Sequence, residues 1–181
     1  LYSETNARTL WDNYTLSSLN DSQGRLWVGT KTGLQRYNRL TDDFHRIPQD
    51  WNKGIPKSPV HDIFEDNNKN IWIATSVGLH KYLEREQRFE HYRPPSIVQG
   101  EEFVVTGIEE NSRHGLWLAT YSGLYEFDTI NKRFILHPLE IDSMAEHRIH
   151  VIKSWDQKDL WVGTQFGLYR YHVETGEITA Y

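Results

Sequence analysis

The sequence predicts an all-β protein built from four copies of one unit of about 45 residues, each of which folds into four short strands. Three observations support this prediction. A Trp followed by Gly or Ala two residues later and by Thr three residues later recurs in steps of 45, 45 and 44 residues, at Trp27, Trp72, Trp117 and Trp161. A Gly-Leu pair follows each of these segments, and an apolar stretch ending in an acid precedes it, at Asp21, Asp66, Glu110 and Asp156.

The first copy predicts the strands of the unit. They are expected near Leu16–Asn20, Arg25–Thr30, Leu34–Asn38 and Phe44–Ile47. In the second of these strands, alternation places Leu26, Val28 and Thr30 on one face and Trp27 and Gly29 on the other. Both faces are largely apolar, so the strand needs burial on both sides. The residue two positions after each Trp is always small, which lets a neighbouring sheet approach and seat the ring.

The connection between the second and third strands is predicted to be a three-residue hairpin loop. Its third residue is Gly in every copy, which fits a type I turn that ends in the left-handed conformation. Only Gly adopts that conformation without strain. The structural role therefore explains the four glycines, Gly33, Gly78, Gly123 and Gly167, and equally the four repeated tryptophans.

A four-stranded unit that is sandwiched between copies of itself is a propeller blade. The fold class predicted is thus a segment of a β-propeller with four antiparallel blades, at residues 15–48, 59–93, 103–138 and 149–181, after a lead-in over residues 1–14. Helical repeats of similar length would show a 3.6-residue period, which is not visible here. A β-solenoid would have shorter turns.

The repeated pattern resembles the two-component regulator propeller repeat, over about 165 of the 181 residues. Its elements are an acid and a Gly-rich turn, then Leu-Trp-(Val/Ile/Leu)-(Gly/Ala)-Thr, two residues, Gly-Leu and an aromatic residue. The first copy ends in Tyr37-Asn38 and the third in Phe127-Asp128, close to the aromatic-Asp ending of the family. The second and fourth copies depart from it with Leu83 and His172, which lie in turns rather than in the core.

The resemblance implies a non-catalytic, periplasmic, ligand-sensing region of a bacterial signal-transduction receptor. Such repeats usually belong to membrane-anchored sensor kinases or to related proteins with cyclase outputs, and the well-known gut-bacterial members respond to oligosaccharides. Propellers of this family commonly have seven blades. Four blades are therefore expected to be either part of a larger ring or an arc that pairs with a second copy, and the chain is interpreted as a piece of a longer protein.

Composition excludes several function classes. The formal net charge of -5, with 20 basic and 25 acidic residues, does not favour a nucleic-acid partner. No apolar run approaches the roughly 18 residues of a membrane span. With no Cys and with the nine His residues scattered, we expect no metal, no cofactor and mainly surface histidines. No catalytic residue is assigned, because adjacent pairs such as Glu109 and Glu110 point to opposite faces of a strand.

The candidate ligand-binding residues are those expected in the loops of one propeller face. They combine aromatic platforms for sugar rings with amide, imidazole and cationic groups for hydroxyls. The set is Trp51, Lys53, Tyr121, His147, Arg148, Gln165 and Phe166. The alternative interpretation is that Trp51 caps a seam between blades and that the turn aromatics shield a sheet edge.

Three functions remain open on the sequence alone. The first is a sensor segment that binds an oligosaccharide or another small solute. The second is a protein-interaction or dimerisation scaffold, whose partner is a second copy or further blades of the same protein. The third is a propeller lyase or glycosidase, because a fold does not by itself exclude chemistry.

Overall fold

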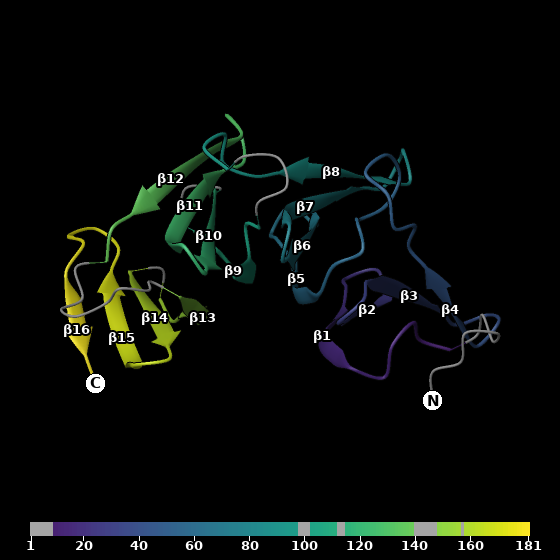
Figure 1. The fold of residues 1–181 in the computed structure, drawn as a ribbon, viewed down its shortest axis with the longest axis horizontal. Helices are drawn as coiled ribbons and strands as arrows, with labels where there is room; N and C mark the ends of the chain where they lie inside the picture. Colours follow the sequence, from purple (N-terminus) through teal and green to yellow (C-terminus); the bar gives the residue numbers. More distant parts are fainter. Residues whose placement is uncertain (1–8, 98–101, 112–114, 140–147, 157) are drawn as a thin grey trace. The chain divides into compact units, whose positions relative to one another are not determined.

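The computed structural model describes residues 9–97, 102–111, 115–139, 148–156 and 158–181, which form sixteen β-strands and no helix (Figure 1). The strands of the first two sheets are β1 (Thr15–Asn20), β2 (Leu26–Thr30), β3 (Leu34–Asn38), β4 (Asp43–Arg46), β5 (Val60–Glu65), β6 (Ile71–Thr75), β7 (Gly78–Leu83) and β8 (Arg88–Tyr92). Those of the other two are β9 (Val105–Glu110), β10 (Gly115–Thr120), β11 (Gly123–Asp128), β12 (Arg133–His137), β13 (Ile149–Ser154), β14 (Asp159–Thr164), β15 (Gly167–His172) and β16 (Ile178–Ala180).

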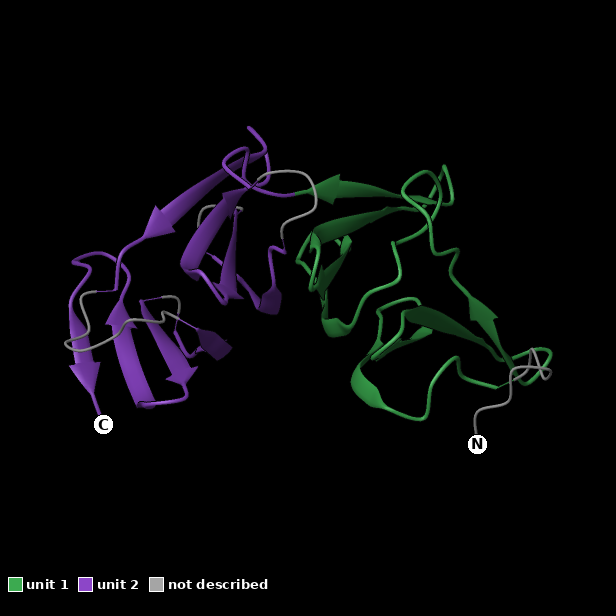
Figure 2. Ribbon diagram, in the orientation of Figure 1, with its two compact units in different colours: residues 1–92 green, residues 93–181 purple. Residues whose placement is uncertain are grey.

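Each sheet is an antiparallel meander in which strands that are consecutive in sequence are neighbours in space. The orders are β1-β2-β3-β4, β5-β6-β7-β8, β9-β10-β11-β12 and β13-β14-β15-β16. This is the architecture of four propeller blades, and the predicted all-β propeller fold is confirmed. The blades group into two compact units, residues 1–92 with blades one and two, and residues 93–181 with blades three and four (Figure 2).

The core of the first unit lies between its two blades. Strand β5 packs on β1 and β2. The indole of Trp27 is fully buried and meets the ring of Tyr82, from the next blade, edge-on at a centroid distance of 5.1 Å. Apolar side chains from both blades, among them Leu34, Ile63 and Ile73, complete this core. The Trp of one blade therefore seats an aromatic ring of the following blade.

The second unit repeats the arrangement. Trp117 lies 6.0 Å from the ring of Tyr171 in the following blade, and Ile152 and Val162 belong to the same core. Trp161, in the last blade, is only half-buried and contacts Tyr181 instead. Three of the four repeated tryptophans are thus buried, and the fourth lies on a blade face that no following blade of the chain covers.

Gly29, the small residue two positions after Trp27, stands where no side chain would fit. A Cβ atom added to Gly29 would lie 2.6 Å from Cγ1 of Val60, which belongs to β5 of the next blade. It would also lie 2.4 Å from Oγ of Ser17 in β1. Because interiors are packed without voids, even one methyl group here would push the blades apart.

The hairpin between the second and third strands differs from the prediction. In the second blade Thr75 pairs directly with Gly78, so the loop has two residues rather than three, and blades three and four are alike. Gly78 has a φ of 138°, well beyond the left-handed helical value near +57°. The predicted type I turn with a left-handed third residue is therefore wrong. Gly is still required, because this part of the positive-φ region is essentially restricted to it.

The repeated Thr explains the shorter loop. Thr75 Oγ1 lies 3.0 Å from the carbonyl oxygen of Gly78 and accepts a hydrogen bond from the N–H of Val77. The corresponding Thr makes the same two contacts in the other three blades. The hydroxyl oxygen thus accepts a hydrogen bond from a backbone N–H that a tight turn would otherwise leave unpaired.

In the first two blades, the acid that lies six residues before the Trp holds the first turn of the blade. Asp66 Oδ2 accepts a hydrogen bond from Nε1 of Trp72 at 2.8 Å, and Oδ1 accepts one from the N–H of Asn70. In the third blade the equivalent residue is Asn111, whose Oδ1 accepts from the N–H of Gly115. Glu110, the acid that ends the apolar stretch of this blade, stands one residue before Asn111, which lies six residues before Trp117 and so takes the position of Asp21 and Asp66.

Candidate functional site

The long loop of residues 47–59, between β4 and β5, presents Trp51. Ile47 and Ile55 bury the two ends of the loop in the core. Gln49 Nε2 donates to the carbonyl oxygen of Thr32 at 2.5 Å, which ties the loop to the first blade. Asp50 Oδ1 accepts hydrogen bonds from two backbone N–H groups of the loop, at 2.8 Å each. These hydrogen bonds lower the pKa of Asp50, and the smaller opposing effect of burial does not cancel them. These contacts hold the loop in place on the first unit.

The indole of Trp51 is half-exposed, and its buried side is held by two histidine rings. Its ring meets His91 edge-on at a centroid distance of 5.0 Å and lies 6.4 Å from His80. The carbonyl oxygen of Trp51 accepts a hydrogen bond from Nε2 of His91 at 2.9 Å. An indole that is held by other rings while half of its surface meets solvent is suited to stacking against an apolar sugar face. Lys53, in the same loop, is exposed.

A second aromatic cluster lies in the second unit, at the β10–β11 turn. The guanidinium of Arg148 lies 5.0 Å above the ring of Tyr121, and the ring of His150 meets Tyr121 edge-on at 6.0 Å. All three residues are exposed. The structure therefore brings together two of the predicted site residues, Tyr121 and Arg148, and adds His150, which the sequence analysis did not single out.

The remaining predicted site residues are not joined to either cluster by the contacts described. Gln165 and Phe166 form the exposed turn between β14 and β15, where the N–H of Phe166 donates to Thr164 Oγ1. His147 lies outside the described residues. Trp51 and Lys53 belong to the first unit and the other predicted residues to the second. Their joint assignment to one binding face stays a prediction.

Sequence reasoning missed the two histidines beneath Trp51. His80 is completely buried, which corrects the expectation of mainly surface histidines for this residue. The signal that could have found the pair is their register, since His80 of β7 and His91 of β8 are direct cross-strand neighbours. Burial lowers the pKa of both, and for His80 the neighbouring His91 lowers it further.

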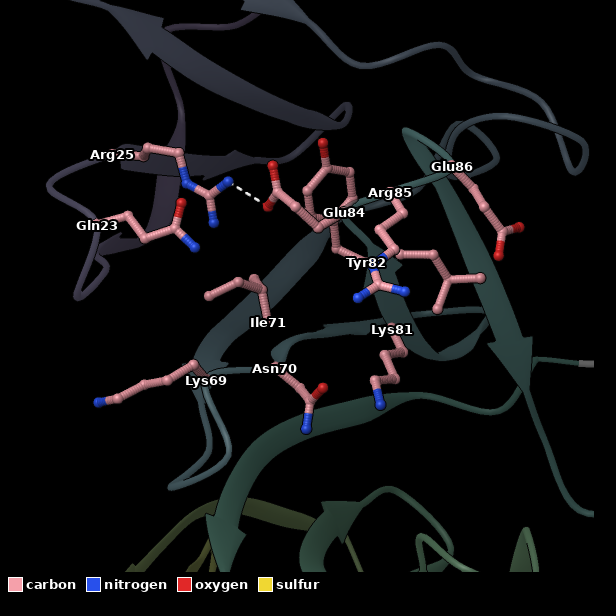
Figure 3. Close-up of a pocket in the computed structure, with 11 residues that line it drawn as sticks. Gln23, Arg25, Lys69, Asn70, Ile71, Lys81, Tyr82, Glu84, Arg85 and Glu86 are labelled. Carbon is pink, nitrogen blue, oxygen red and sulfur yellow. Dashed lines mark hydrogen bonds and ion pairs between the residues drawn. The ribbon is translucent and has the colours of Figure 1, made fainter.

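A shallow cavity of about 240 Å³ opens between the two blades of the first unit (Figure 3). It is formed by the β1–β2, β5–β6 and β7–β8 turns, and Arg25 forms an ion pair with Glu84 across it. Lys69 and Arg85 add positive charge and Glu86 adds negative charge at its rim. The charges of both signs and the absence of an exposed aromatic platform make this cavity a weaker sugar site than the Trp51 loop.

Two features were sought in the part of the chain that the structure describes, a group of metal-ligating side chains and a membrane-spanning helix. Those residues contain no group of three His, Cys, Asp or Glu side chains that could hold a metal ion. They contain no helix that is long and apolar enough to cross a membrane. Glu109 and Glu110 pair with Trp117 and Leu116 respectively, so their side chains point to opposite faces of the sheet.

Two segments of the chain match a known family model, described as the two component regulator propeller. The matched segments are residues 9–32 and 54–76, which run from the lead-in of each of the first two blades to the turn after its second strand. These two segments therefore match the two-component regulator propeller repeat, and the resemblance identified from the Trp, Thr and Gly-Leu spacing is confirmed. No curated protein matches the chain.

Solved structures share the fold over nearly the whole chain. The extracellular domain assigned to the hybrid two-component system BT3049 of B. thetaiotaomicron aligns with a TM-score of 0.80 and 22% identity, over 96% of this chain and 25% of that one. The corresponding domain of BT4673, from the same organism, aligns with a TM-score of 0.78 and 20% identity, over 97% of this chain and 23% of that one. Virginiamycin B lyase of Staphylococcus aureus aligns with a TM-score of 0.70 and 16% identity, over 96% of this chain and 57% of that one. The chain thus spans about a quarter of the length of the sensor structures that it matches.

Proposed function

We propose that this chain is part of the extracytoplasmic, periplasmic sensor region of a bacterial two-component receptor. The matched repeats and the fold shared with extracellular domains of hybrid two-component systems support this role. The region binds its ligand and catalyses no reaction, and the signalling output belongs to other parts of the parent protein. The fold shared with a lyase makes product analysis part of the test.

The ligand that the geometry favours is an oligosaccharide, and the observation that carries this proposal is the Trp51 platform. Its indole is half-exposed, ring contacts fix its orientation, and the loop that bears it is anchored in the core at both ends. Binding to a preformed aromatic surface avoids the entropic cost of ordering a loop. Lys53 and Asp50 lie in the same loop and offer polar groups to sugar hydroxyls.

The test is calorimetric titration of the 181-residue protein with a panel of neutral and acidic oligosaccharides. For a glycan that binds, Trp51→Ala is expected to weaken affinity about tenfold, which corresponds to about 1.4 kcal/mol. Tyr14→Ala is the control, because it removes an exposed aromatic ring of the first unit that lies outside the loop. Equal binding by wild type and Trp51→Ala would place the ligand elsewhere, and release of shortened or unsaturated glycans would support a lyase or glycosidase.

A second candidate function, an interaction scaffold, is favoured by the last blade. An apolar hollow of about 520 Å³ on its face is lined by Trp155, Trp161 and Leu168, with Asp159 and Arg170 beside them. In the first and third blades, the corresponding face, which carries Trp27 or Trp117, is covered by the next blade. This face therefore suits a further blade of the parent protein or a second copy of the chain.

A further inference from the structure

A continuous hydrogen-bonded chain joins the core of the second blade to the loop that carries Trp51. At its centre, Nδ1 of His80 and Nδ1 of His91 lie 2.7 Å apart across β7 and β8. On the buried side, His80 Nε2 lies 2.8 Å from Thr75 Oγ1. On the exposed side, His91 Nε2 lies 2.9 Å from the carbonyl oxygen of Trp51.

Chemistry fixes where the protons lie when both rings are neutral. A carbonyl oxygen only accepts, so His91 carries its proton on Nε2 and its Nδ1 is an acceptor. His80 must then carry its proton on Nδ1, which leaves its Nε2 as an acceptor for the hydroxyl of Thr75. The two histidines are therefore in opposite tautomers, and every group in the chain has a partner.

One additional proton can enter without moving either ring. His80 then carries a proton on Nε2 and donates it to Thr75 Oγ1, while the shared Nδ1 proton resides on His91. The Thr75 hydroxyl turns to the carbonyl oxygen of Gly78, which lies 3.0 Å away. The charge rests on His91, the less buried ring, and His80 remains neutral.

A second additional proton cannot be accommodated. It would place N–H groups on both Nδ1 atoms, at a separation of 2.7 Å, with like charges on the two rings. Burial lowers the pKa of His91; Arg88 lowers it as well, whereas the Trp51 carbonyl, Asp50 and Glu90 raise it. Burial and then His91 lower the pKa of His80. Acid below the ordinary histidine pKa of 6.5 therefore favours a state in which the rings separate.

We propose that the His80–His91 pair is a proton-operated latch, which holds Trp51 on the second blade and releases it on acidification, while Ile47 and Ile55 keep the rest of the loop in the core. The latch adds regulation to the sugar platform and in that respect rests on the proposed function. Its opening and closing need no ligand. At neutral pH the indole is presented in its fixed orientation, and in acid it is freed from the rings beneath it.

The experiment is nuclear magnetic resonance spectroscopy of the complete 181-residue protein, without ligand, from pH 8 to pH 5. Long-range nitrogen–proton spectra report the histidine tautomers. The indole N–H resonance of Trp51, assigned by its loss in Trp51→Phe, reports the loop. We expect opposite tautomers for His80 and His91 at pH 8, and a displacement of the Trp51 resonance that begins below pH 6.5.

His91→Gln is the informative variant, because glutamine keeps a donor for the Trp51 carbonyl but does not titrate in this range. Its Trp51 resonance is expected to lose the displacement. His45→Gln, which changes an exposed histidine of the first blade, is expected to retain it. A displacement that persists in His91→Gln, or identical tautomers for the two rings in the wild type, overturns the latch. Neither result depends on glycan binding, so failure of the latch and failure of the sugar site are distinguishable.

Discussion

Single carboxylates act at the seams of this repeat protein, as the first blade illustrates. Asp21 accepts hydrogen bonds from Nε1 of the buried Trp27 and from Nε of Arg25, at 2.9 and 2.7 Å. Burial opposes ionisation of Asp21, but these hydrogen bonds outweigh it and lower its pKa. Arg25 in turn reaches Glu84 of the second blade. One side chain thus orients the indole, closes a turn and supports an ion pair between blades.

Asp21→Ala is expected to lower the free energy of unfolding by about 1–3 kcal/mol, because the buried indole N–H of Trp27 loses its acceptor. Chemical denaturation monitored by Trp fluorescence measures this. Glu174→Ala, which removes an exposed acid from the last blade, is the control and should be nearly neutral. Because the pKa of Asp21 is lowered, its contribution is present above the ordinary value of 3.8 and is lost as the pH falls below it. The wild-type and Asp21→Ala stabilities should therefore converge in acid.

At the scale of an element, the Thr-x-x-Gly hairpin is the device that every blade uses to turn from its second to its third strand. The threonine hydroxyl bonds the turn, and the glycine three positions later has a φ between 118° and 158°. In the second blade the threonine of this motif, Thr75, also contacts His80 of the latch. The side chain of Thr75 therefore takes part both in the hairpin turn and in the proposed latch.

Gly78→Ala is expected to cost about 1–3 kcal/mol, because its φ of 138° is strained for any residue with a Cβ. Gly24→Asn is the matched control. Gly24 has a φ of 76° with open space around it, and asparagine tolerates the left-handed region. Thermal unfolding followed by circular dichroism should show a clear decrease in Tm for the first variant and a small one for the second. Equal decreases would show that the hairpin glycine is not specifically required.

At the scale of the whole molecule, the blade formed by β13–β16 leaves apolar surface exposed. Trp155 is 86% exposed and Trp161 and Leu168 lie beside it on the last blade. Exposed apolar patches of this kind mark interaction surfaces. Repeat units bury their hydrophobic faces by stacking, so this apolar face is suited to packing against another unit.

The double variant Trp155→Ser/Leu168→Ser is expected to reduce self-association of the 181-residue protein. Light scattering across a concentration series measures this as a loss of the concentration-dependent increase in mass. Leu40→Ser, which removes a 96% exposed leucine from the turn between β3 and β4, should leave association unchanged. A wild type that is monomeric at all concentrations would contradict a role of this face in pairing two copies, and would leave further blades as its partner.

The sequence by itself determined the architecture of this protein. The spacing of Trp27, Trp72, Trp117 and Trp161, with a small residue always two positions later, is a local signal that repeats four times, and blade packing depends on those residues. It also led to the correct repeat type and to Trp51 as an exposed aromatic. The turn geometry was predicted less well, because loop length depends on the hydroxyl of the repeated Thr, whose bonding a residue count does not reveal.

Only the tertiary structure decided how the candidate site is built. His80 and His91 are eleven residues apart and look like ordinary polar residues, yet register across β7 and β8 places their Nδ1 atoms 2.7 Å apart. The Trp51 loop reaches them from another part of the chain, 40 residues before His91. Repeat patterns encode contacts that recur in every blade. A contact made once, between a loop and a strand pair, leaves no periodic signal in the sequence. Only the tertiary structure therefore shows it.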